Sequence, residues 1–113
     1  MSEIINLTPH TLNIRLDLGM LEVPTMGIVA RVTEQRAERP AIPTSEGWCA
    51  VVSVTYGEVT GLPDPQAGHV YVVSRLVRQA LDAAGDRRPD VLCPGPLLRN
   101  DAGVVVGCSG LSL

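Results

Sequence analysis

Residues 48–56 read Trp-Cys-Ala-Val-Val-Ser-Val-Thr-Tyr, and this stretch carries the strongest β-strand signal in the chain. β-branched and aromatic residues dominate it, and such side chains fit the pleated surface of a sheet. The sequence therefore predicts a central strand at these residues, within a fold that contains several strands.

The segments on either side of this strand have a different character. Residues 33–47 are polar and contain Pro40 and Pro43, so we expect the end of a strand followed by an exposed loop rather than a helix. Residues 57–68 contain three glycines and two prolines, which predicts a rigid loop.

Further strands are expected along the rest of the chain. Apolar and polar residues alternate over residues 3–7 and 11–16, which predicts a half-buried strand. Pro9 interrupts it, because proline has no backbone N–H for a ladder, and we expect a bulge, an edge or a short turn there. Short strands are also predicted at residues 21–23, 28–32, 69–73 and 90–93, and a hairpin over residues 97–108 turns at Gly103.

One helix is predicted, and it begins after Ser74, a favourable N-cap residue. Apolar residues recur at helical spacing from Leu76, and Gly85 follows in the C′ position. Arg78 and Asp82 are four residues apart on the opposite face, where we expect a solvated ion pair worth at most about 0.5 kcal/mol.

These elements define the expected fold class. A chain of 113 residues has the length of one domain, so we expect a single domain over residues 1–113. The class is α+β, with a curved, mainly antiparallel sheet of about six to seven short strands and one main helix at about residues 74–84.

The amino-acid composition argues against several classes of protein. Only 3% of the residues are aromatic against 45% hydrophobic, so the core must be aliphatic. A net charge of −3 argues against generic nucleic acid binding, because such proteins neutralise phosphates. The N-terminal residues lack the features of a signal peptide and no apolar run is long enough to span a membrane, so we expect a cytoplasmic protein without membrane association.

The cysteines and histidines suggest no metal and no cofactor. Cys49, Cys93 and Cys108 are odd in number and widely spaced, which favours reduced, mostly buried thiols and leaves their reactivity open. Common catalytic motifs are missing from the sequence, so an enzyme is the less favoured interpretation. A small enzyme that uses Cys93 or Cys108 with His10 nevertheless stays an alternative, because an imidazole ionises a neighbouring thiol.

Arginine gives the most promising binding signal, because all nine basic residues are Arg and many lie at strand ends, turns or the helix start. Such places commonly assemble anion sites. The competing interpretation is that they are ordinary surface cations in a chain without lysine. The predicted site for a small anionic or nucleotide-like ligand comprises His10, Tyr56, Ser74, Arg75, Arg78 and Arg99.

Three stretches are distinctive together: Ile-Asn-Leu-Thr-Pro-His at residues 5–10, residues 57–66 leading into 71–74, and residues 99–108. In this order and spacing the chain resembles a family of small bacteriophage and prophage proteins of unknown function, and the opening Asn-Leu-Thr-Pro-His is the most distinctive part. The resemblance implies that a phage or prophage encodes the chain, and it implies no catalytic residue.

In that setting we expect a phage-encoded accessory protein that acts by stoichiometric binding in the host cytoplasm. The leading expectation is counter-defence, in which the protein sequesters a nucleotide-derived immune signal or inhibits a host defence protein. A virion or assembly component is the other alternative, with a homo-oligomer formed through exposed strand edges.

Overall fold

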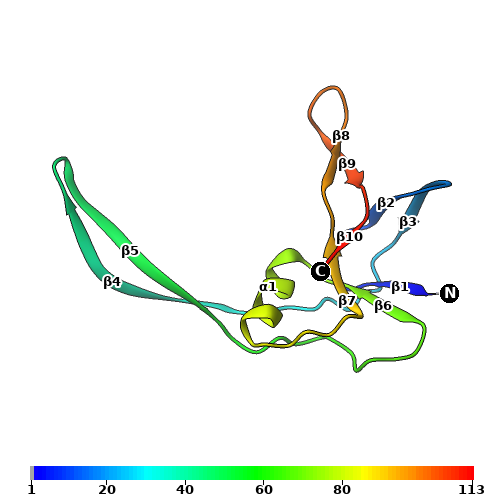
Figure 1. Cartoon of the computed structure of the whole chain (residues 1–113), viewed down its shortest axis with the longest axis horizontal. Coiled ribbons are helices and arrows are strands. Elements are labelled where there is room, and N and C mark those ends of the chain that lie inside the picture. The colour runs from blue at the N-terminus through cyan, green and yellow to red at the C-terminus, as the bar shows by residue number, and fades with distance from the viewer. Residues whose placement is uncertain (1) are drawn as a thin grey trace.

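The computed structural model describes residues 2–113, in which ten strands and one helix form a body and a projecting arm (Figure 1). The body contains two four-stranded sheets, and the arm is a two-stranded hairpin. The molecule measures 56 × 40 × 22 Å. The expected α+β class is confirmed in its coarse form, since the chain is mostly β with one short helix. The strands are divided among three sheets rather than gathered in one.

The first sheet has the order β1-β6-β7-β10. Its strands are β1 (Glu3–Asn6), β6 (His69–Val72), β7 (Val91–Pro94) and β10 (Leu111–Ser112). β1, β6 and β7 run parallel, which differs from the mainly antiparallel sheet expected from the sequence. Parallel neighbours cannot be joined by a tight turn: the helix α1 (Arg75–Ala83) provides the crossover from β6 to β7, and residues 7–68 connect β1 to β6.

The second sheet has the order β3-β2-β9-β8. It consists of the hairpin of β2 (Leu12–Leu16) with β3 (Gly19–Val23) and the hairpin of β8 (Leu97–Arg99) with β9 (Val105–Cys108). The two hairpins meet in a parallel bridge between Ile14 and Cys108. Gly107 permits this close approach, because a Cβ there would lie 2.6 Å from the carbonyl oxygen of Asn13.

The core lies between α1 and the first sheet. Its buried residues are aliphatic apart from Tyr71, as the low aromatic content predicts. They are Ile5, Leu7, Ala30, Tyr71, Val73, Val77, Leu81 and Val91. The predicted N-cap is also present, since Ser74 Oγ accepts a hydrogen bond from the backbone N–H of Val77.

The predicted break at Pro9 is a turn between β1 and β2 that the side chain of Asn6 fixes. Asn6 is 1% exposed. Its amide nitrogen donates to the carbonyl oxygens of His10 at 2.8 Å and Val23 at 3.0 Å, while its Oδ1 accepts from the backbone N–H of Thr8 at 2.9 Å. The most distinctive part of the sequence, Asn-Leu-Thr-Pro-His, therefore builds a corner of the fold.

The arm consists of β4 (Glu34–Thr44) and β5 (Gly47–Tyr56) and corrects two expectations. Residues 33–47 are predicted as the end of a strand followed by an exposed loop, but they contain the whole of the long strand β4, because pairing with β5 satisfies its backbone groups. Residues 48–56 do form a strand, but it lies in the arm and not in the centre of a sheet. Residues 28–32 contribute one isolated bridge, Arg31 with Thr60, rather than a regular strand.

Candidate functional site

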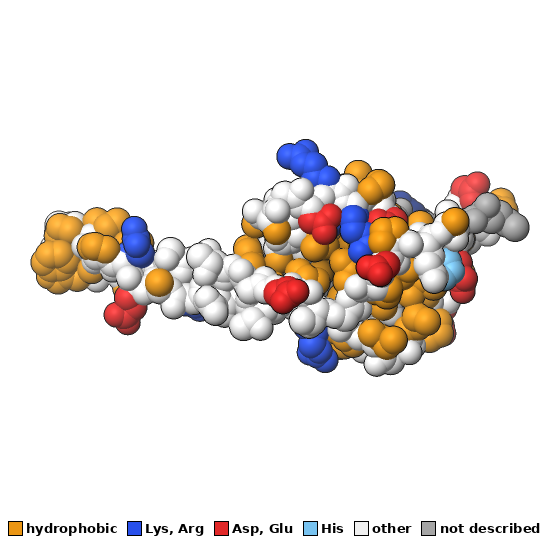
Figure 2. Space-filling view, turned by 90° about the horizontal axis from the view of Figure 1, so that it is seen from below, with side chains coloured by type: hydrophobic (Ala, Val, Ile, Leu, Met, Phe, Trp, Pro, Cys, Tyr) orange, Lys and Arg blue, Asp and Glu red, His pale blue; other side chains and the backbone are white. Residues whose placement is uncertain are grey.

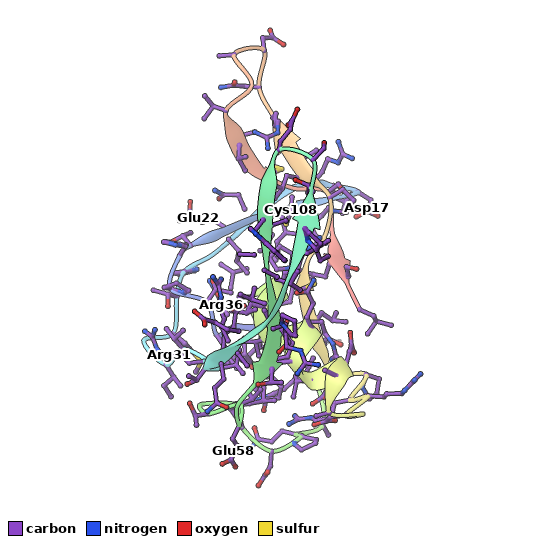
Figure 3. The ribbon with its side chains drawn as sticks, turned by 90° about the vertical axis from the view of Figure 1, so that its left-hand side faces the viewer. Asp17, Glu22, Arg31, Arg36, Glu58 and Cys108 are labelled. Atoms are coloured by element: carbon purple, nitrogen blue, oxygen red, sulfur yellow. The ribbon has the colours of Figure 1, made fainter. Side chains whose placement is uncertain are left out.

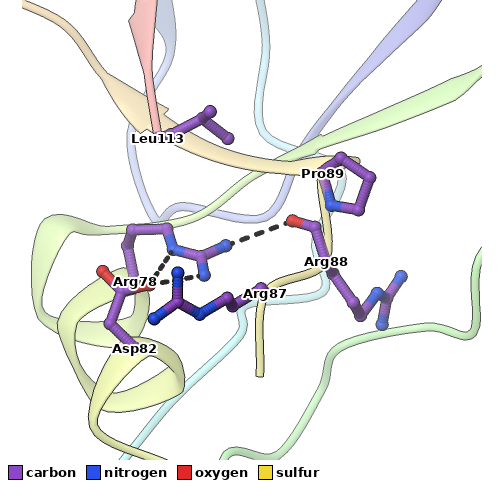
Figure 4. A pocket seen from close by; sticks show the side chains of 6 residues that line it. All are labelled: Arg78, Asp82, Arg87, Arg88, Pro89 and Leu113. Atoms are coloured by element: carbon purple, nitrogen blue, oxygen red, sulfur yellow. Dashed lines mark hydrogen bonds and ion pairs between the residues drawn. The ribbon is translucent and has the colours of Figure 1, made fainter. Parts of the chain in front are cut away.

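Arg78 is the predicted site residue whose environment differs most from expectation. It is 4% exposed, so the predicted solvated face is wrong at this position. Its guanidinium donates to Asp82 Oδ1 at 2.7 Å and to the carbonyl oxygens of Val91 and Asp86, each at 2.9 Å. The long side chain thus turns back over the segment that leads into β7, where it holds α1 to the sheet (Figure 4).

A cavity of about 400 Å³ lies beside this arginine (Figure 4). Arg87 and Arg88, which the predicted site lacks, line it together with Arg78. Their signal in the sequence is the Asp-Arg-Arg-Pro turn at residues 86–89, directly after the helix. Within residues 2–113 the structure records no ion pair for Arg87. Of the three arginines, it is therefore the one whose charge has no carboxylate partner there.

Arg88 is held by Asp90 in a two-point contact. Its Nη2 and Nε lie 2.7 Å and 3.1 Å from the two carboxylate oxygens of Asp90. The hydrogen bonds from Arg88 lower the pKa of Asp90, and the same contact raises the pKa of Arg88. Arg88 also lies over the ring of Tyr71, with 5.8 Å between Cζ and the ring centroid. It therefore connects the turn after α1 to the core.

The other predicted site residues are dispersed. Ser74 lines a cavity of about 350 Å³ with Thr8, Pro9 and Arg31, so the break after β1 and the helix start do meet. The structure places the remaining four elsewhere: His10 on a groove beside β2 and β9, Tyr56 at the arm base, Arg75 exposed on α1, and Arg99 in the β8–β9 hairpin, where it donates to the carbonyl of Gly103.

His10 and Cys108 line the same groove, which has a volume of about 510 Å³. This is the pair named in the enzyme alternative. Cys108 is only 3% exposed, and Cys93 is equally buried, whereas Cys49 is exposed on the arm. Little of either body thiol is therefore accessible to a substrate.

Two further findings concern the part of the chain that the structure describes. Residues 2–113 hold no group of three His, Cys, Asp or Glu side chains placed to bind one metal ion. Over the same residues, no helix has the length and apolar character that crossing a bilayer requires.

The arm presents an apolar row on one of its faces. Because side chains alternate along a strand, Trp48, Ala50, Val52, Val54 and Tyr56 of β5 project to the same face. Trp48 is 75% exposed and Val52 is 54% exposed. The sequence signal for this row is the run 48–56 itself, which reads as a buried strand when it is considered alone.

Apolar side chains also gather at the far end of the arm (Figure 2). Ile42 of β4 is exposed there together with Trp48. All residues of β4 are exposed, including Arg36, which is labelled in Figure 3. Exposed apolar groups of this kind are typical of interaction surfaces.

The two edges of the arm differ. β4 contains Pro40 and Pro43 and a shift of register between Arg39 and Ile42. Proline, charge and bulges protect an edge strand from further pairing. β5 contains neither proline nor a charged residue. The outer edge of β5 is therefore open to another strand.

The arm contributes no residue to the core cluster among the residues described. It is held by the pairing of β4 with β5, and it is anchored at its base where the N–H of Gly57 donates to the carbonyl of Thr33 at 2.7 Å. A two-stranded hairpin without further packing is marginally stable in water. Within one copy of the chain, the arm thus has little packing beyond its own strand pairing.

No protein-family model, no curated protein and no solved structure matches this chain. The resemblance to phage and prophage proteins therefore stays a prediction.

Proposed function

We propose that this chain is an assembly component that binds protein stoichiometrically through the β4–β5 arm. The observation that carries the proposal is the arm itself, with its exposed apolar row and its open β5 edge. For a chain that resembles phage and prophage proteins, this function corresponds to a virion or assembly component.

The chemistry of the arm favours protein over a small ligand. An extended strand offers backbone hydrogen bonds along its whole edge, and its alternating side chains give specificity, which is the usual basis of binding by strand addition. Trp48 supplies an aromatic anchor near the tip, and tryptophan is among the residues that contribute most to protein interfaces. The cavity beside Arg78 and the groove beside His10 contain no residue of the arm.

The experiment that tests this function compares two substitutions of exposed apolar residues in the full chain. Trp48→Ser removes the anchor on the arm, and Leu18→Ser removes a side chain that is 95% exposed in the turn between β2 and β3. Each protein is mixed with the phage or prophage particles encoded beside it and sedimented. We expect the parent chain and Leu18→Ser to co-sediment and Trp48→Ser to stay in solution; equal recovery of all three, or none, would refute the proposal.

A second candidate is the sequestration of a small anion, which the cavity lined by Arg78, Arg87 and Arg88 favours. Arg87 supplies the uncommitted positive charge there, and Arg75, exposed on α1, offers a matched control. Thermal shift against cyclic dinucleotides, cyclic ADP-ribose isomers and ordinary nucleotides tests it. A ligand should raise the melting temperature of the parent chain and of Arg75→Gln but not that of Arg87→Gln. If no compound raises the melting temperature of the parent chain, this candidate function is refuted.

A further inference from the structure

We propose that two copies of this chain pair their arms along β5 in antiparallel orientation, so that Trp48 of each copy enters an alanine-lined recess at the arm base of the other. This inference rests on the proposed assembly function and names its first partner as a second copy of the chain.

The outer edge of β5 is the surface on which the pairing occurs. The prolines and the register shift of β4 protect the other edge, as described above. Because β5 has no charged residue over Gly47–Tyr56, two copies can align without repulsion between like charges. An edge that lacks every usual protection is the one on which another strand adds.

A two-fold axis at Val52 matches the apolar rows of the two copies. It places Val52 opposite the partner's Val52, Ala50 opposite the partner's Val54, and Trp48 opposite the partner's Tyr56. Opposite residues in an antiparallel pair share one face of the sheet, so the two rows join into one apolar stripe. The aromatic pairs at both ends are the kind that stabilises neighbouring strands.

A recess lies where this register delivers the indole ring. It has a volume of about 320 Å³ and is lined by Val54 to Gly57 of the arm base and by Ala80, Ala83 and Ala84 of α1. The small alanine side chains leave the space open. Each copy thus has one exposed tryptophan and one apolar recess, and a two-fold dimer uses both twice, as an isologous interface requires.

The antiparallel orientation also separates the two bodies. Nine paired residues span about 30 Å at roughly 3.3 Å per residue. The bodies then lie at opposite ends of a four-stranded sheet, β4-β5 from one copy and β5-β4 from the other. Four strands, with the joined apolar stripe along the two central β5 strands, exceed the minimum of about three that a sheet needs for stability of its own. Dimerisation thereby gives the exposed arm the packing it lacks in one copy.

Cysteine cross-linking of the full chain tests the register. In a Cys49→Ser background, Val52→Cys brings two thiols face to face across the two-fold axis, whereas Val54→Cys faces the partner's Ala50. We expect Val52→Cys to form a covalent dimer under mild oxidation at least about tenfold faster than Val54→Cys, since the geometry of a disulfide is strict. Equal rates, or no dimer with either variant, would overturn the proposed pairing.

Fluorescence tests the recess separately, because Trp48 is the single tryptophan of the chain. Its emission should shift to the blue as protein concentration rises and the dimer forms. Ala83→Glu fills the recess while keeping a residue suited to a helix, and it should abolish the shift. Ala102→Glu, in the exposed turn of the β8–β9 hairpin, should leave it intact. A shift that Ala83→Glu does not alter would refute the assignment of the recess.

Self-pairing of the arm and its binding to particles are distinguished by the same variants. If the chain sediments as a monomer and Val52→Cys gives no dimer while Trp48→Ser still loses binding to particles, the self-pairing is wrong and the assembly function stands. If particle binding is also unaffected by Trp48→Ser, both are wrong.

Discussion

Replacing the buried Arg78 by methionine should destabilise the fold strongly. Methionine keeps much of the apolar stem and removes the guanidinium, which leaves the carbonyl oxygens of Val91 and Asp86 without their 2.9 Å donors. Each buried acceptor that loses its hydrogen bond costs about 1–3 kcal/mol. Asp82 adds little, because its side chain is 58% exposed and such pairs are worth about 0–1 kcal/mol. We expect a loss of about 2–4 kcal/mol for Arg78→Met.

Urea unfolding followed by circular dichroism measures this loss. Arg75→Met is the matched control, since Arg75 is on the same helix and exposed. Asp82→Asn isolates the ion pair and should cost no more than about 1 kcal/mol. The reasoning is refuted if Arg78→Met unfolds at the same urea concentration as Arg75→Met. It is refuted equally if Asp82→Asn accounts for the whole effect, because the carbonyl contacts would then contribute nothing.

Three other predictions follow from the body and the arm. Arg88 lowers the pKa of Asp90, so their pair contributes stability that is fully present above the ordinary carboxyl pKa of 3.8 and is lost as the pH falls below it. Acid titration of stability should show the advantage of the parent chain over Asp90→Asn shrinking over that range; a constant difference would contradict the assignment. Gly107→Ala should cost about 1–3 kcal/mol in a thermal or urea melt, because its Cβ meets a backbone oxygen at 2.6 Å, whereas Gly57→Ala, with 3.4 Å to its nearest neighbour, should be tolerated. A thiol reagent counted by mass spectrometry should modify Cys49 quickly and the two buried thiols only on unfolding, and uniform labelling of all three would show that the body opens readily.

Local signals account for the elements that the sequence predicts well. Ser74 as N-cap and Gly85 after the last turn frame α1, and both act through backbone groups of the helix itself. The strands at the N-terminus, at residues 69–72 and in the β8–β9 hairpin likewise have patterns that are complete within a few residues.

The misplaced elements depend on partners that are distant in the sequence. β4 is polar and contains two prolines, so its extended conformation comes from β5 and not from its own composition. The same holds for Arg78, whose helical position predicts exposure and whose burial depends on carbonyls 8 and 13 residues further along the chain. In the first sheet, the α1 crossover accounts for the parallel pairing of β6 with β7, while β1 pairs with β6 across the long segment of residues 7–68.

The candidate site was the least predictable part. The exposed row on β5 has the same residue types as a buried strand, and nothing within residues 48–56 says which of the two it is. Likewise, the local sequence does not distinguish Arg78, which belongs to the predicted anion site, from Arg87, which does not. In the structure, the guanidinium of Arg78 is bound to backbone carbonyls, and Arg87 lines a cavity.

The length of the arm can change without altering the packing of the body. Since no described residue of the arm belongs to the core cluster, its extent does not affect how the body packs. Adding two residues to each strand would carry Trp48 outward by about 7 Å and return every side chain to its original face. The number of residues in the arm therefore sets the distance between the body and Trp48, in steps of two residues that keep each side chain on its face.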